Sequence, residues 1–83
     1  MIRLYETSTC PRCKRLAGFL QICKIEFVEE PLDAGAATEY LCSTGKPALA
    51  APILQVDEDW YGPEDLFEGQ ELAVHFLQEI LDL

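Results

Sequence analysis

The stretch LYETSTCPRCKRLAGFL, residues 4–20, decides the fold because it joins a strand to a helix through a pair of cysteines. Residues 2–6 alternate apolar and polar side chains, which is typical of a strand. Residues 11–23 carry apolar side chains at helical spacing, and Pro11 suits the first helical position, where its missing N–H costs nothing. The pattern predicts a strand, a short polar connection, and a helix that begins directly after Cys10.

The same reasoning predicts five further elements along the chain. They are a strand at residues 24–30, a helix at 34–45, strands at 52–56 and 60–61, and a helix that opens at Pro63 and continues over 71–81. Asp33 suits the N-cap of the second helix, and Gly45 suits its end. Gly69 is expected to break or kink the last helix.

This β-α-β-α-β-β-α order predicts an α/β fold with a four-stranded mixed sheet flanked by helices. The first two strands form a parallel pair because a helix connects them, and the last two are antiparallel because a tight turn at residues 57–59 connects them. A chain of 83 residues, 49% of them hydrophobic, is the size of one domain with one ordinary core. We therefore expect residues 1–83 to form a single domain.

The charge of the chain restricts its partners. The net charge is −9, all six Lys and Arg residues lie before residue 47, and the rest of the chain is acidic. This balance disfavours nucleic acid and anionic membranes as partners. The first residues carry no apolar run of signal-peptide length, and charged residues or Gln interrupt the longer apolar stretches. We expect a cytoplasmic protein that does not enter the membrane.

Cys10 and Cys13 form a C-x-x-C pair at the start of the first predicted helix. Unpaired backbone N–H groups and the positive end of the helix favour the thiolate of Cys10, which is the nucleophilic form of the side chain. Arg12, Lys14 and Arg15 add positive charge nearby. Cys13 lies one turn further on and is expected to be more enclosed. It is therefore well placed to attack a mixed disulfide formed on Cys10.

Half of a zinc site is the alternative interpretation of a C-x-x-C pair. A tetrahedral site needs two more ligands, but Cys23, Cys42 and His75 are isolated from one another along the chain, so we expect no metal site. Cys23 lies on the apolar face of the first helix and is expected to be buried as a small hydrophobe. A partly buried, inert thiol is the favoured interpretation of Cys42. An extra thiol open to glutathionylation or dimerisation is its alternative.

Three segments of the chain resemble glutaredoxins, a family within the thioredoxin-fold superfamily. They are residues 4–20, AAPIL at 50–54 and WYGPEDL at 60–66, so the resemblance covers essentially the whole chain. It implies a cis peptide bond between Ala51 and Pro52, packed against the C-x-x-C loop. It also implies that Ala51 offers its backbone N–H and C=O to a bound peptide or to glutathione, as an added strand would.

The resemblance also implies a site for glutathione. Asp65, together with Gly62 and Glu64 at the start of the last helix, would hold the γ-glutamyl end. Thr7 stands where the family commonly has a lysine, and Tyr61 replaces the first glycine of a Gly-Gly pair. Arg12 and Lys46 are the candidates to replace the charge of the missing lysine.

The expected function is that of a glutaredoxin-type thiol–disulfide oxidoreductase acting on protein or glutathione mixed disulfides. Cys10 and Cys13 are the expected catalytic residues, and Arg12 and Lys14 are expected to favour the Cys10 thiolate. The resemblance implies no bound cofactor, glutathione as a co-substrate, and a monomer. One alternative is an electron-donor redoxin for an enzyme such as ribonucleotide reductase, itself reduced by a flavoprotein. Another is a cysteine-ligated metal or iron–sulfur carrier.

Overall fold

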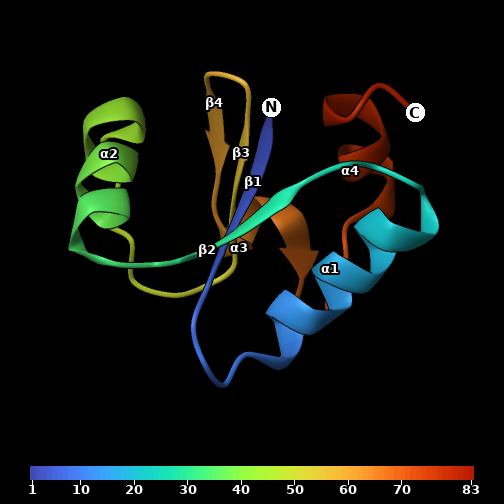
Figure 1. Cartoon of the computed structure of the whole chain (residues 1–83), viewed down its shortest axis with the longest axis horizontal. Coiled ribbons are helices and arrows are strands. Elements are labelled where there is room, and N and C mark those ends of the chain that lie inside the picture. The colour runs from blue at the N-terminus through green and yellow to red at the C-terminus, as the bar shows by residue number, and fades with distance from the viewer.

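A four-stranded mixed sheet forms the centre of the computed structural model, which describes all residues from 1 to 83 (Figure 1). The strands are β1 (Ile2–Glu6), β2 (Val28–Pro31), β3 (Ile53–Val56) and β4 (Asp59–Tyr61), in the spatial order β2-β1-β3-β4. β1 pairs with β2 in parallel and with β3 in antiparallel orientation, and β3 pairs with β4 in antiparallel orientation. The predicted mixed sheet is therefore confirmed.

Four helices surround the sheet: α1 (Pro11–Ile22), α2 (Ala34–Thr44), α3 (Pro63–Leu66) and α4 (Val74–Ile80). Pro11 is the first residue of α1, as predicted. The Asp33 side chain accepts a 2.9 Å hydrogen bond from the N–H of Ala36 and so caps α2. Gly45 ends α2 in the left-handed region, with φ of 76°. None of these helices has the length and apolar character needed to cross a membrane.

The sheet has a core on each face, because side chains alternate along its strands. Figure 1 shows α1 and α4 on one side of the sheet and α2 alone on the other. Leu4 and Leu54 pack with buried residues of α1, α3 and α4, whereas Tyr5 and Ile53 pack with buried residues of α2. The two cores hold β1 and β3 in place, and the connections at the ends of these strands carry the site described below.

The second strand is shorter than predicted, because β2 starts at Val28 and not at residue 24. Lys24 adopts a positive φ of 59° directly after α1, and the N–H of Ile25 bonds back to the C=O of Leu20 at 3.0 Å. These contacts end the helix and turn the chain toward the sheet. Ile25 and Phe27 are half-buried against the larger core, so their alternation reflects burial in a connection and not strand pairing.

The predicted last helix is interrupted by a small hairpin. α3 is a single turn, and β5 (Phe67–Glu68) then pairs with β6 (Glu71–Leu72) before α4 begins at Val74, not at residue 71. Gly69 supplies a positive φ of 65° at the hairpin turn, so it does break the helix, as expected. The hairpin itself was not predicted. It places the buried side chain of Phe67 beside the start of α1.

Candidate active site

Cys10 and Cys13 are joined by a disulfide at the N-terminus of α1, with their Cα atoms 5.2 Å apart. Cys10 is the N-cap residue, and its Sγ accepts a hydrogen bond from the N–H of Cys13 at 3.0 Å. Cys10 is 8% exposed and Cys13 is 1% exposed, so Cys13 is the more enclosed sulfur, as expected. An incoming sulfur therefore meets Cys10 first.

The peptide bond between Ala51 and Pro52 is cis, as the resemblance implied, and it lies just before β3. Ala51 is buried and packs in one cluster with Cys10 and Cys13. The C-x-x-C loop and the connection that precedes β3 thus meet at the end of the sheet. The two cysteines and the backbone expected to orient a substrate are brought together in one place.

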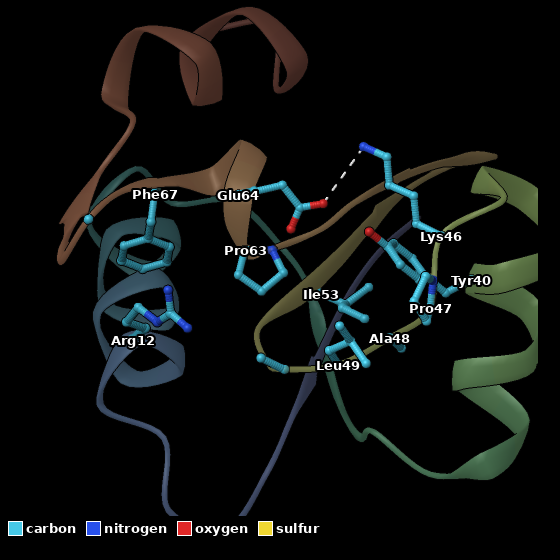
Figure 2. A pocket seen from close by; sticks show the side chains of 12 residues that line it. Arg12, Tyr40, Lys46, Pro47, Ala48, Leu49, Ile53, Pro63, Glu64 and Phe67 are labelled. Atoms are coloured by element: carbon cyan, nitrogen blue, oxygen red, sulfur yellow. Dashed lines mark ion pairs between the residues drawn. The ribbon is translucent and has the colours of Figure 1, made fainter.

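Two adjoining hollows lie beside this disulfide. The first, of about 540 Å³, is lined by Cys10, by Thr7 and by residues of both connections. The second, of about 510 Å³, lies between α3 and the segment 46–50 (Figure 2). Both are lined by Arg12, Leu49 and Ala50. We refer to the two hollows together as the groove. It leads from Cys10 to Lys46 and Glu64.

Charged side chains lie at both ends of the second hollow. The Arg12 guanidinium lies over the ring of Phe67, 5.6 Å from its centroid, which is a cation–π geometry. Lys46 Nζ and Glu64 Oε1 lie 3.8 Å apart, and Figure 2 shows the two side chains reaching toward each other. Leu49 is 88% exposed at the edge of the groove. The second hollow is therefore lined by apolar side chains together with two cations and one anion.

Only one of the three cations near the cysteines lines the groove. Lys14 and Arg15 line a separate hollow beside Gly18 and Phe19, and an Arg15 N–H donates to the C=O of Gln70. Of these three cations, Arg12 is therefore the one whose charge lies beside the groove. No contact in the structure supports the expectation that Lys14 acts with Arg12 on Cys10.

Gly62 and Asp65 lie at the start of α3, next to the groove. The N–H of Gly62 donates to Asp65 Oδ2 at 3.3 Å, so the Asp65 carboxylate caps the turn. Burial, followed by the charges of Glu64 and Asp65, raises the pKa of Tyr40 above its ordinary value. Tyr40 and Glu64 both line the groove, and the Glu64 carboxylate lies close to the Tyr40 hydroxyl.

Some residues of the groove were not found by sequence reasoning. Tyr40, Leu49 and Phe67 line it, yet each comes from a different part of the chain. Their sequence patterns are those of ordinary helix, loop and core residues, so no local signal distinguishes them. Only the packing of α2, the segment 46–50 and the hairpin brings them together.

The other cysteines differ from expectation. Cys23 is the C-cap residue of α1 and is half-buried, so it does not lie fully buried on the apolar face of the helix. Cys42 is exposed on α2, so its expected partial burial is wrong. His75 is exposed on α4. No group of three or more His, Cys, Asp or Glu side chains is placed to hold a metal ion.

Comparison with known proteins shows the fold and leaves the family open. No family model matches the sequence, and no curated protein matches it. The structure is similar to that of the thioredoxin-like protein BC3987, with a TM-score of 0.69, 20% identity, and coverage of 96% of this chain and 99% of that one. A point mutant of the same protein gives a TM-score of 0.71 at 20% identity, over 98% and 94% of the chains.

A glutaredoxin from Archaeoglobus fulgidus is similar at a TM-score of 0.69 and 18% identity, over 96% of this chain and 84% of that one. The chain described here therefore has the thioredoxin fold. This fold, with Cys10 and Cys13 at disulfide distance, supports a redox function.

Proposed function

We propose that this thioredoxin-fold chain is a thiol–disulfide oxidoreductase of glutaredoxin type. The observation that carries the proposal is the position of the Cys10–Cys13 disulfide. It lies at the N-terminus of α1, against Ala51 of the cis Ala51–Pro52 peptide, and at one end of an open groove. The solved glutaredoxin with the same fold supports this assignment.

Substrate reduction in this proposal takes two exchange steps. In the reduced protein, the Cys10 thiolate attacks one sulfur of a substrate disulfide, and the other substrate sulfur leaves as a thiolate. The Cys13 thiolate then attacks Cys10 Sγ, releases the second substrate thiolate, and leaves the disulfide seen in the structure. The two protein thiols supply both electrons. Cys10 is the attacking residue because it is the more exposed sulfur and the one at the helix N-cap.

The groove is the proposed site for the substrate. Ala51 and Pro52 orient the substrate backbone beside Cys10, and Arg12, Lys46, Gly62, Glu64 and Asp65 form the remaining proposed binding residues. Glutathione is the proposed co-substrate that reduces the disulfide again, and disulfide-containing proteins are the proposed substrates. We place the reaction in the cytoplasm, where thiols are kept reduced, and assign it to the monomer.

A dedicated electron-donor redoxin, reduced by a flavoprotein, is a second candidate function. Two observations favour it. Thr7 lines the hollow at Cys10 in place of a lysine, and Lys46 is already paired with Glu64. The groove therefore offers a carboxylate of glutathione fewer free cations than a glutaredoxin with that lysine would offer. Reduction by thioredoxin reductase together with indifference to glutathione would favour this candidate.

Mass spectrometry with peptide mapping, after equilibration in graded glutathione redox buffers, tests the proposal. We expect the Cys10–Cys13 disulfide to open and re-form within the range of cellular redox poise. Cys13→Ser is expected to accumulate a Cys10–glutathione adduct, because the resolving thiol is missing. If Cys10→Ser still reduces disulfides, the proposed function is wrong.

A further inference from the structure

We propose that Glu64 is a specificity-determining residue. Its carboxylate forms an ion pair with Lys46 in the groove and so disfavours glutathione relative to uncharged thiols and disulfides. The inference rests on the proposed function, because it concerns which substrates reach Cys10. The preferred substrates are protein disulfides whose flanking segment is neutral or cationic where it meets Glu64.

The ion pair between Lys46 and Glu64 spans the groove. Lys46 follows the end of α2 and Glu64 lies in α3, so the pair connects two walls that come from distant parts of the sequence (Figure 2). The two side chains are 58% and 56% exposed, and their charged atoms are 3.8 Å apart. Each remains accessible to a ligand, yet the cation already has an anionic neighbour.

The Glu64 carboxylate also lies close to the backbone at the start of α3. A Cβ atom on Gly62 would lie 2.9 and 3.1 Å from the two carboxylate oxygens of Glu64. The carboxylate of Asp65 is held at the same turn by the N–H of Gly62. This end of the groove is therefore lined by one anion, Glu64, beside one cation, Lys46, and a second anion, Asp65, lies next to it. The remaining cation that lines the groove, Arg12, lies over Phe67 at the opposite end of the second hollow.

Glutathione carries two carboxylates and one ammonium group, so it is a net anion at neutral pH. A glutathione sulfur at Cys10 brings one carboxylate along the groove, where it must displace the Glu64 carboxylate from Lys46 and remain near like charges. Repulsion at about 4 Å in a solvated site changes a rate by roughly threefold to tenfold, and salt screens it. An uncharged thiol meets no such repulsion.

Opening of the oxidised protein by a thiol provides a direct test. A glutathione thiolate attacks Cys10 Sγ, the bond between Cys10 and Cys13 breaks, and Cys13 leaves as a thiolate. A second glutathione thiolate then attacks the glutathione sulfur of the mixed disulfide, which releases the Cys10 thiolate and oxidised glutathione. The two glutathione molecules supply both electrons. With 2-mercaptoethanol the same steps occur without any carboxylate.

The experiment measures the rate constant for disulfide opening by glutathione and by 2-mercaptoethanol, using acid quenching and mass spectrometry. The quantity compared is the ratio of the rate constant for glutathione to that for 2-mercaptoethanol. This ratio cancels changes in the intrinsic reactivity of the disulfide, because such changes affect both thiols. We expect Glu64→Gln to raise this ratio about threefold to tenfold at low ionic strength, and the gain to shrink in about 1 M salt. The matched control is Glu79→Gln, which removes the same charge from an exposed position on α4 and should leave the ratio unchanged.

A second substitution tests the pairing itself. Lys46→Gln in the Glu64→Gln background should return the ratio close to that of the unaltered protein, because the glutathione carboxylate then has no cation to meet. A double variant that keeps the full gain would show that Glu64 acts without Lys46, and would overturn the inference.

The remaining outcomes separate the two proposals. If both thiols open the disulfide but Glu64→Gln leaves their ratio unchanged, or if Glu79→Gln changes it equally, the inference about Glu64 is wrong and the proposed function stands. If neither thiol opens the disulfide in the unaltered protein, both are wrong.

Discussion

Gly62 lies against the hydroxyl group of Tyr40, with no room between them for a side-chain methyl group. A Cβ atom on Gly62 would overlap the Tyr40 hydroxyl oxygen and would approach the Glu64 carboxylate to 2.9 Å. Tyr40 is 2% exposed on α2, and Gly62 is the residue before α3. This contact therefore fixes the distance between two walls of the groove.

Gly62→Ala is expected to destabilise the protein by about 1–3 kcal/mol, because the new methyl group forces Tyr40 or the start of α3 to move. The backbone at Gly62 has a φ of −98°, so the cost comes from steric overlap and not from backbone strain. Urea unfolding, followed by circular dichroism, measures the change in the free energy of unfolding.

Gly18→Ala is the matched control for this prediction. Gly18 lies inside α1, and a Cβ atom there meets nothing within 4 Å. The same substitution should therefore stabilise the protein by roughly 0.5–1 kcal/mol, through the better helix propensity of alanine. Equal effects of the two substitutions would contradict the contact described for Gly62.

The stability of the protein should depend on pH through Glu6 and Glu29. A hydrogen bond to the Glu29 carboxyl group, followed by burial and the Glu29 charge, raises the pKa of Glu6 from 4.5 to about 6. The folded state thus holds a proton that the unfolded state has released between these pH values. The stabilisation is present below about pH 4.5 and is lost as the pH rises through about 6.

Glu29→Gln should remove this contribution. We expect the variant to lose less stability than the unaltered protein between pH 4.5 and 6, and to be more stable at pH 7 by roughly 0.2–1 kcal/mol, the range for like charges on adjacent strands. Urea midpoints across the pH range provide the measurement. Glu26→Gln, at an exposed position in the connection before β2, serves as the control. It should leave the dependence of stability on pH unchanged.

The four cysteines should react with an alkylating agent in an order set by their exposure. In the oxidised protein Cys42 should be labelled first, Cys23 more slowly because it is half-buried, and the disulfide-bonded pair not at all. After reduction, Cys10 should react before Cys13, which is the more enclosed of the two. Peptide mapping after several labelling times gives the order in which the cysteines are alkylated. Labelling of Cys23 ahead of Cys42 would show that α1 ends differently from the structure described here.

Much of the fold could be predicted because the local signals agree with the tertiary structure. The alternation in β1, the proline that opens α1, and the residues Asp33 and Gly45 that bound α2 each act through their own backbone neighbours. The errors arise where burial imitates a periodic pattern. Residues 24–27 alternate because they cover the core, and the hairpin of β5 and β6 interrupts apolar spacing that suits a helix.

The candidate site was predictable only in part. The cysteine pair carries its signal in the sequence, because the spacing and the preceding strand place Cys10 at a helix N-terminus. The groove carries no such signal, because its walls come from α2, the segment 46–50, α3 and the hairpin. Packing also sets the direction in which each cationic side chain points. Arg12 lies over Phe67, whereas Arg15 bonds the C=O of Gln70.

Arg12→Met should slow the opening of the disulfide by glutathione more than its opening by 2-mercaptoethanol. Arg12 lines both hollows of the groove, so its charge lies beside the path of an anionic thiol. Methionine keeps an unbranched side chain over Phe67, so packing is largely retained while the charge is lost. The expected loss in the ratio of the two rate constants is about threefold to tenfold at low salt.

Lys14→Met is the control for Arg12→Met, because it removes the same charge from the same helix. Lys14 lines the hollow beside Gly18 and Phe19, away from the groove. If the charge of α1 as a whole attracted glutathione, both variants would lower the ratio equally. A loss confined to Arg12→Met would instead assign the attraction to Arg12, the one cation of α1 that lines the groove. Equal losses would contradict that assignment.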